Sequence, residues 1–187
     1  MIDPRLRHPL ALRRAPGRVL EAAMREGIAP SFESIEGWVF RGWNTLWLTR
    51  LFGFQKFAKG FYRGAERACG PSPFLQGYNV VVAQNGNWDT HQPRPSEARP
   101  RLHGYYRVYQ APNRYANALF LDYAKGANGL NPAGLLRDYL VQPWPDEPDL
   151  LLGKAYVALG VWVPVSFFVL QRWRAGWATD SRSGPSS

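Results

Sequence analysis

Apolar and polar side chains alternate along most of the chain, which is the two-residue period of a β-strand that faces a core on one side. Segments with this period recur at near-even spacing, and Gly, Pro and Asn interrupt the pattern between them. Eight strands are predicted in this way, at residues 37–43, 54–63, 76–84, 103–110, 116–123, 137–142, 150–159 and 161–173. Because no long helix separates them, the strands predict an antiparallel meander.

A sheet of this size either closes on itself or packs as two layers. We therefore predict an all-β fold, an antiparallel eight-stranded barrel with a short N-terminal helix, and a β-sandwich is the alternative. The helix is predicted at residues 18–27, where apolar side chains fall at helical spacing before Gly27. A mobile leader is the alternative there. Residues 44–53 predict a further helical turn that ends at Gly53.

The chain of 187 residues fits one barrel domain, residues 18–174, between a basic flexible arm at 1–17 and a disordered tail at 175–187. A hydrophobic content of 45% and an aromatic content of 14% exclude a disordered protein. The apolar run at 155–170 is too short for a membrane span, and Gly160 and Pro164 interrupt it. It therefore predicts a hairpin of two strands.

The net charge is +9, and part of the excess lies in the two ends of the chain. The body has no long run of Lys and Arg, so no specific nucleic-acid partner is predicted. Binding of an anionic surface or a nucleic acid through the arm is an alternative. The single cysteine, Cys69, excludes an intrachain disulfide, and the N-terminus lacks the apolar stretch of a secretory signal. Both observations favour a cytoplasmic protein.

The middle of the chain carries motifs that are similar to those of a known family. They are the Gly-Trp pairs at 37–38 and 42–43, Leu121-Asp122-Tyr123, the stretch 137–142, and Arg172 at the end of the last strand. In these residues the chain resembles the lipocalin and fatty-acid-binding (calycin) barrels, although Leu121 replaces a Thr and the strict Gly-x-Trp spacing is absent. The resemblance implies a calycin-like barrel in which Arg172 packs on Trp38 or Trp43 at the closed end.

One predicted strand has an unusual face. The residues on that face of strand 103–110 are His103, Tyr105, Arg107 and Tyr109. If the face is interior, Arg107 needs a carboxylate or an anionic ligand, because an unpaired buried guanidinium is costly. If it is exterior, Tyr106 and Val108 line the interior instead. Arg107-x-Tyr109 also resembles the pair that holds a carboxylate in fatty-acid-binding barrels.

Lys154 interrupts the apolar strand 150–159. It is either a snorkelling or paired lysine, or a desolvated one with a lowered pKa that is suited to base or imine chemistry. Asp122 and Asp138, on neighbouring predicted strands, are candidate partners for Arg107 or Lys154, either as a buried ion pair or as an acid–base pair. Phe61 and Phe167 are predicted to contribute to the aromatic wall of a ligand site.

The sequence predicts no metal site and no cofactor. The three histidines, His8, His91 and His103, lack ligand spacing, and no phosphate-binding loop or nucleophile motif occurs. A haem held by His103 alone is the remaining alternative.

The predicted function is binding of a small, mostly apolar or amphipathic molecule, lipid-like or polyketide-like, in a barrel cavity. Arg107, Tyr109 and Lys154 would hold its polar end. The alternative is a cofactor-free isomerase or cyclase that uses Tyr, Asp and Lys as acid and base in the same cavity. The sequence does not set the oligomeric state.

Overall fold

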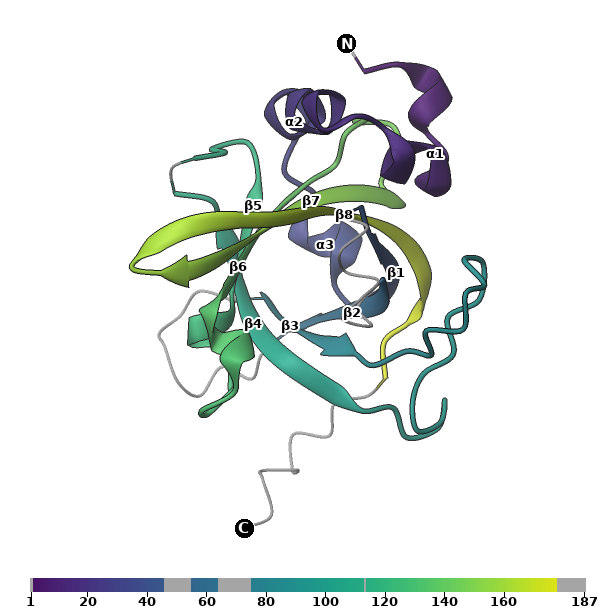
Figure 1. Cartoon of the computed structure of the whole chain (residues 1–187), viewed down its shortest axis with the longest axis vertical. Helices are drawn as coiled ribbons and strands as arrows, with labels where there is room; N and C mark the ends of the chain where they lie inside the picture. The colour runs from purple at the N-terminus through teal and green to yellow at the C-terminus, as the bar shows by residue number, and fades with distance from the viewer. Residues whose placement is uncertain (1, 46–54, 64–74, 113, 178–187) are drawn as a thin grey trace.

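The computed structural model describes residues 2–45, 55–63, 75–112 and 114–177, which form a closed antiparallel barrel (Figure 1). Each strand pairs with its neighbours in the chain, and the last strand pairs with the first. The strands are β1 (Trp38–Asn44), β2 (Lys56–Arg63), β3 (Leu75–Val80), β4 (Leu102–Gln110), β5 (Leu119–Asp122), β6 (Leu136–Val141), β7 (Leu150–Leu159) and β8 (Val161–Ala175). The predicted eight-stranded barrel is therefore confirmed over the sandwich.

The alternating pattern locates the strands well because one face of each strand is buried inside the barrel. β7 has the predicted bounds, and Gly160 turns the chain into β8 with a φ of 79°. β3 is shorter than predicted, since beyond Val80 the chain forms only an isolated bridge between Val82 and Pro93. The helical turn predicted at 44–53 lies mostly outside the described residues.

The N-terminal segment is helical and packs on the outside of the barrel. It contains η1 (Pro4–Leu6), α1 (Pro9–Arg14), α2 (Gly17–Glu26) and α3 (Phe32–Ile35), of which α2 matches the predicted helix. Leu12 of α1 and Leu20 of α2 are buried in one cluster with Leu152 and Val169 of β7 and β8. Helix α1 therefore contributes Leu12 to the core, in a segment where the sequence predicts a flexible arm. Helical geometry gathers the few apolar residues of this Arg-rich segment on one face.

Among the residues that the structure describes, three apolar clusters lie against the barrel wall, one inside and two outside. The interior cluster receives side chains from α3 and every strand: Ile35, Phe40, Phe61, Leu75, Tyr106, Val108, Leu119, Leu121, Leu140, Leu151, Phe168 and Leu170. A second cluster lies under α1 and α2, on the outer faces of β5 to β8. The third includes Val39, Ala58 and Tyr78, on the outer faces of β1 to β3. Both surfaces of the wall are therefore apolar over much of the barrel.

Several aromatic rings of the wall lie over glycines. Each ring and its glycine are directly opposite on neighbouring strands: Phe57 with Gly42, Tyr78 with Gly60, Tyr106 with Gly77, and Phe168 with Gly153. A Cβ atom built on any of these four glycines would overlap the ring. Each ring therefore fits only because its partner has no side chain.

The two ends of the barrel differ. Where β1 begins and β8 ends, the guanidinium of Arg172 lies 4.6 Å from the ring centre of Trp38. Arg172 also donates a hydrogen bond to the carbonyl oxygen of Ser34, at 2.8 Å. The contact between Arg172 and Trp38 that the resemblance implied is therefore present. The opposite end holds the β7–β8 turn and the segment with η3 (Tyr123–Lys125) and η4 (Pro132–Leu135).

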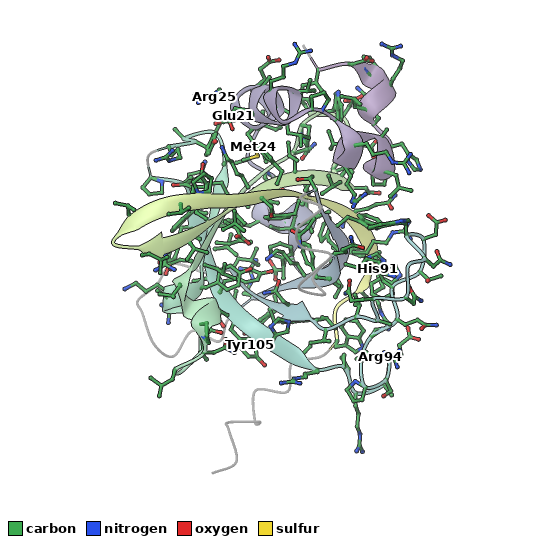
Figure 2. The ribbon with its side chains drawn as sticks, in the orientation of Figure 1. Glu21, Met24, Arg25, His91, Arg94 and Tyr105 are labelled. Carbon is green, nitrogen blue, oxygen red and sulfur yellow. The ribbon has the colours of Figure 1, made fainter. Side chains whose placement is uncertain are left out.

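The segment between β3 and β4 covers the outer face of β1 and β2, with His91 and Arg94 on it (Figure 2). The ammonium of Lys56 donates to the carbonyl oxygens of Asn87 and Thr90, at 2.6 and 2.8 Å. The ring of His91 packs edge-on against Trp43 with centroids 5.0 Å apart, and burial lowers the pKa of His91 to about 4. The predicted polar loop is therefore fixed to the barrel by a few buried polar groups.

Candidate functional site

A polar cluster lies inside the barrel. The ammonium of Lys59 donates to Oδ1 of Asn79 and Oδ2 of Asp138, both at 3.0 Å. Its third hydrogen bond is to the hydroxyl of Tyr123, which itself donates to Oδ2 of Asp138 at 3.0 Å. Asn79 in turn donates to the carbonyl oxygen of Gly104 at 3.1 Å. The strand period turns Lys59 of β2, Asn79 of β3 and Asp138 of β6 inward, and Tyr123 joins them from η3, directly after β5.

Aromatic rings surround the ammonium of Lys59. Its Nζ lies 5.6, 4.9, 5.0 and 5.3 Å from the ring centres of Phe57, Tyr106, Tyr123 and Phe168, respectively. Burial lowers the pKa of Lys59, and the charge of Asp138 opposes part of this effect. Burial also raises the pKa of Tyr106 and Tyr123 well above the ordinary value, so both hydroxyls stay protonated.

Asp138 has one acceptor atom left over. Its Oδ2 accepts from Lys59 and Tyr123, whereas its buried Oδ1 has no hydrogen-bond partner among the described residues. Such an acceptor suits a neutral donor, for example a hydroxyl or an amide N–H. A buried anion there would lie beside the carboxylate of Asp138, and the charge of that carboxylate already balances the one cation that pairs with it among the described residues, Lys59. The interior chemistry therefore disfavours an anionic ligand.

A second lysine cluster lies outside the barrel, under α2, where Figure 2 labels Glu21. The ammonium of Lys154 donates to Oε2 of Glu21 at 2.7 Å and to the hydroxyl of Tyr115 at 3.0 Å. Burial disfavours the charge of Lys154, but the hydrogen bonds to Glu21 and Tyr115 outweigh it, and the pKa of Lys154 is raised. Lys154 therefore stays protonated, and the alternative of a lowered pKa for base or imine chemistry is wrong.

A pocket of about 490 Å³ opens beside this cluster, between the N-terminal helices and β8. Its lining residues are Arg13, Arg14, Ala15, Gly17, Leu20, Thr45, Lys154, Pro164, Val165, Ser166 and Phe167. Arg13 donates to the carbonyl oxygen of Asn44 at 2.9 Å, and its guanidinium lies 4.0 Å from the ring centre of Trp88. Within the described part of the chain, no carboxylate pairs with Arg13 or Arg14. The pocket combines apolar walls with an excess of positive charge.

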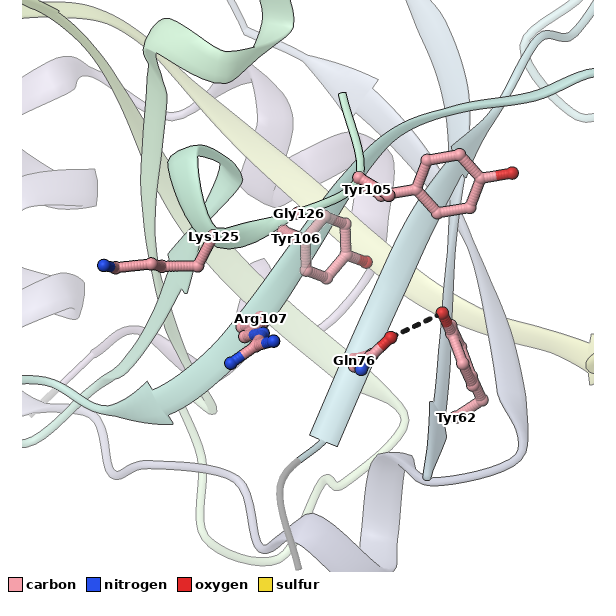
Figure 3. Close-up of a pocket in the computed structure, with 8 residues that line it drawn as sticks. Tyr62, Gln76, Tyr105, Tyr106, Arg107, Lys125 and Gly126 are labelled. Atoms are coloured by element: carbon pink, nitrogen blue, oxygen red, sulfur yellow. Dashed lines mark hydrogen bonds between the residues drawn. The ribbon is translucent and has the colours of Figure 1, made fainter. Parts of the chain in front are cut away.

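Strand β4 turns its unusual face outward. Tyr106 and Val108 are buried in the interior cluster, and Tyr109 is 36% exposed. Tyr105 and Arg107 line a smaller pocket of about 290 Å³, with Lys125 nearby (Figure 3). The inward orientation of Arg107 and Tyr109 is therefore wrong. The pairing of β4 with β3 decides this, because the ring of Tyr106 fits over a glycine on the interior side of the wall.

The other predicted site residues do not form one site, although Asp122 of β5 lies directly opposite Arg107 of β4. Asp122 pairs with Arg137 at 3.2 Å, and Asp138 pairs with Lys59 instead of the predicted Arg107 or Lys154. His103 lies at the start of β4, where burial lowers its pKa. Phe61 belongs to the interior cluster, and Phe167 lines the 490 Å³ pocket beside Lys154. The structure therefore joins Lys154 with Phe167 and Tyr105 with Arg107, at two separate pockets.

Sequence reasoning missed Lys59, Arg13 and Arg14. Lys59 lies two residues from Phe57 and Phe61, and this spacing alone places the three side chains on the same face of β2. The Pro- and Arg-rich composition of residues 1–17 predicts a flexible arm, and this prediction leaves Arg13 and Arg14 outside the expected site. The signal that was available for α1 was Pro9 followed by apolar residues three positions apart.

Comparison with known proteins found no matching family model, and no curated protein or solved structure of significant similarity. The closed barrel is consistent with a calycin-like architecture, and the fold is compatible with ligand binding. Among the residues that the structure describes, no group of three or more His, Cys, Asp or Glu is placed to hold a metal ion. No helix in the same part of the chain is long and apolar enough to cross a membrane.

Proposed function

We propose that the protein binds a small amphipathic molecule, with an apolar body and an anionic group, in the 490 Å³ pocket between the N-terminal helices and β8. The observation that carries the proposal is the lining of this pocket, in which cations and apolar side chains face the same space. Its volume lies within the range of roughly 300–1,000 Å³ that is typical of small-molecule sites.

The positive charge of the pocket is only partly neutralised. Lys154 is paired with Glu21, whereas Arg13 and Arg14 have no carboxylate partner among the described residues. Burial lowers the pKa of Arg13, and the nearby charge of Arg14 lowers it further. The surroundings therefore disfavour the positive charge of Arg13. An anion near the two guanidinium groups would relieve this repulsion and accept charge-assisted hydrogen bonds.

The apolar part of the lining suits the body of an amphipathic molecule. Leu20 closes the helix side, and Phe167 belongs to the wall of β8. Val165 is 39% exposed and continues the apolar lining toward the end of the hairpin. A chain or ring system that lies along β8 would cover these groups, and its contact with them would supply the apolar share of the affinity.

The pocket replaces the barrel interior as the preferred site. The described interior is occupied by aromatic and aliphatic side chains around Lys59 and Asp138. The free acceptor there suits a neutral donor, so an interior ligand would differ in chemistry from a ligand of the outer pocket. The two sites can therefore be separated by the charge of the probe.

The test uses a fluorescent fatty acid and the corresponding fatty alcohol as probes. Arg14→Met should weaken binding of the acid by about tenfold and leave the alcohol almost unchanged, because it removes charge from an exposed residue while keeping an aliphatic stem. Val165→Glu should weaken both probes, since it narrows the pocket and adds a negative charge. Arg107→Met, at the smaller pocket on β4, is the matched control and should bind both probes like the wild type.

Three results would contradict the proposal. One is equal affinity of wild type and Arg14→Met for the acid. Another is a loss of acid binding in Arg107→Met alone, which would assign the anion to the β4 pocket. A third is tighter binding of the alcohol than of the acid combined with unchanged binding of both probes in Val165→Glu, which would place the ligand outside this pocket.

A further inference from the structure

The tip of the β7–β8 hairpin exposes several large apolar side chains on its two faces. The exposed fractions of its large side chains are 64% for Leu159, 69% for Val161, 39% for Trp162, 45% for Val163 and 39% for Val165. No charged residue occurs between Lys154 and Arg172 in the sequence. Because hairpin turns usually carry polar residues, this run of exposed apolar side chains indicates an interaction surface.

The hairpin extends beyond the rest of the barrel (Figure 1). The pairing of β7 with β6 ends at Val157, and the pairing of β8 with β1 ends at Phe168. Between these positions, the two strands pair only with each other among the described residues. The tip is therefore convex and protrudes, so a rigid partner would need a matching cavity to cover it.

Trp162 is held in place although it is partly exposed. Its ring stacks in parallel on Phe120, with centroids 5.7 Å apart and an interplanar angle of 4°. Tyr139 and Tyr156 contact the same indole at 6.3 Å. The indole of Trp162 is therefore held in position, and little of its side-chain entropy would be lost when a partner covers it.

Basic side chains flank the hairpin. Arg13 and Arg14 line the pocket that Pro164 and Val165 share. On the same outer face of β7 as Lys154, the ring centre of Tyr156 lies 5.3 Å from the guanidinium of Arg114, and Tyr156 contacts Trp162. The neighbouring acids are already paired: Glu21 with Lys154 and Arg25, and Asp122 with Arg137. The flanks of the apolar tip are therefore electropositive, in a chain with a net charge of +9.

We propose that the β7–β8 hairpin docks the protein on an anionic lipid membrane, with the apolar tip among the acyl chains and the flanking arginines at the headgroup phosphates. A lipid surface deforms around a convex tip, and tryptophan and arginine are favoured at its interface. Anionic lipids attract the basic flanks. A second copy of the chain fits less well, because a symmetric contact through the tips would bring the two sets of arginines together.

The test is flotation of the intact protein with vesicles of phosphatidylcholine alone, or with about one third phosphatidylglycerol. The wild type should float with the anionic vesicles and bind the neutral ones at least tenfold more weakly. Leu159→Ser with Val161→Ser should reduce binding to anionic vesicles by at least tenfold. Neither residue lines the 490 Å³ pocket, so this result is independent of the proposed small-molecule site.

Ile28→Ser is the matched control, because Ile28 is 42% exposed and bridges to Gln142, at the barrel end opposite the hairpin tip. It should bind vesicles like the wild type.

Three outcomes would each overturn the proposal: equal loss in Ile28→Ser, unchanged binding in the tip variant, or no vesicle binding by the wild type. A wild-type dimer that the tip variant converts to a monomer in light scattering would assign the surface to a second copy instead. Arg114→Gln should make binding less sensitive to salt, and an unchanged salt dependence would argue against the electrostatic part.

Discussion

Lys59 and Lys154 have similar partners on opposite sides of the barrel wall. Each ammonium donates to one carboxylate and one tyrosine hydroxyl: Lys59 to Asp138 and Tyr123, Lys154 to Glu21 and Tyr115. The side chain of Lys59 is 3% exposed and that of Asp138 4% exposed, whereas those of Lys154 and Glu21 are 15% and 28% exposed. The pKa of Lys59 is lowered by burial, and that of Lys154 is raised by its hydrogen bonds in spite of burial.

The difference shows that hydrogen-bond partners alone do not set the pKa of a buried lysine. Inside the barrel, aromatic rings replace water around Lys59, and burial lowers its pKa although the charge of Asp138 opposes this effect. Under α2, water still reaches part of Lys154 and Glu21, so the same kind of pair keeps its charges at a smaller cost. The inner cluster should therefore respond strongly to the loss of one charge, and the outer cluster weakly.

Asp138→Asn should have the largest effect. It leaves the ammonium of Lys59 buried without a counterion, which typically costs about 3–5 kcal/mol in the free energy of unfolding. Urea denaturation at neutral pH measures the change. Asp122→Asn, which removes the partner of the half-buried Arg137 on the next strand, is the matched control with a smaller expected loss of about 1 kcal/mol. Similar losses in the two variants would contradict the contrast between inside and outside.

Removing both interior charges should restore much of the stability. Lys59→Met combined with Asp138→Leu replaces a buried ion pair by apolar side chains of similar volume, which is often neutral or stabilising. We expect the double variant to recover at least half of the loss seen in Asp138→Asn, by the same denaturation. A double variant as unstable as the single one would show that Tyr123 and Asn79, deprived of partners, dominate the cost.

Glu21→Gln should have a smaller effect, about 1 kcal/mol, because Lys154 keeps its bond to Tyr115 and part of its hydration. Added salt should reduce the difference between wild type and variant, as expected for a partly exposed pair. Arg25→Gln, which removes the exposed partner of the same carboxylate, should cost less than Glu21→Gln. A loss in Glu21→Gln as large as that in Asp138→Asn would erase the distinction between the clusters.

The dependence of stability on alkaline pH should be the smallest effect, and its sign should differ between the lysines. The folded pKa of Lys59 is below the ordinary value of 10.5, so the folded state loses this proton first and stability rises as pH approaches 10.5. The pKa of Lys154 is raised, so its contribution persists below 10.5 and is lost above it. Denaturation curves of wild type, Lys59→Met and Lys154→Met up to about pH 11 should show these opposite slopes, and parallel slopes would refute them.

Much of the fold could be predicted from the period of apolar residues. Strand β7 and the turn at Gly160 were placed correctly because each inward residue meets the same closed interior. The contact of Arg172 with Trp38 followed from the resemblance to calycin barrels. The role of α1 could not be predicted from this period. Leu12 is buried because the outer face of the barrel is apolar as well, and the sequence of α1 alone does not show this.

The candidate site was harder to predict because alternation gives the two faces of a strand but does not say which face is inside. Tyr106 of β4 faces the barrel interior, so the next residue, Arg107, faces outward. The partner of Asp138 is on β2, which is far away in the sequence, so strand spacing could place Lys59 on the face of Phe57 and Phe61 but could not pair it with Asp138. Lys154 interrupts an apolar strand and Phe167 belongs to the next one, so both could be identified from the apolar pattern. The structure places them in the lining of the same pocket.

The aromatic rings that lie over glycines have a consequence for how the chain finds its pairing. A strand that slips by two residues keeps its apolar face inward, so alternation alone does not penalise this error. With such a slip, Phe168 would meet Leu151 or Ala155 in place of Gly153, and its ring would have to leave the wall. Similar conflicts would arise at Phe57, Tyr78 and Tyr106. The glycines therefore encode the register of the barrel, and mispaired barrels are disfavoured by steric overlap at several separate points along the sheet.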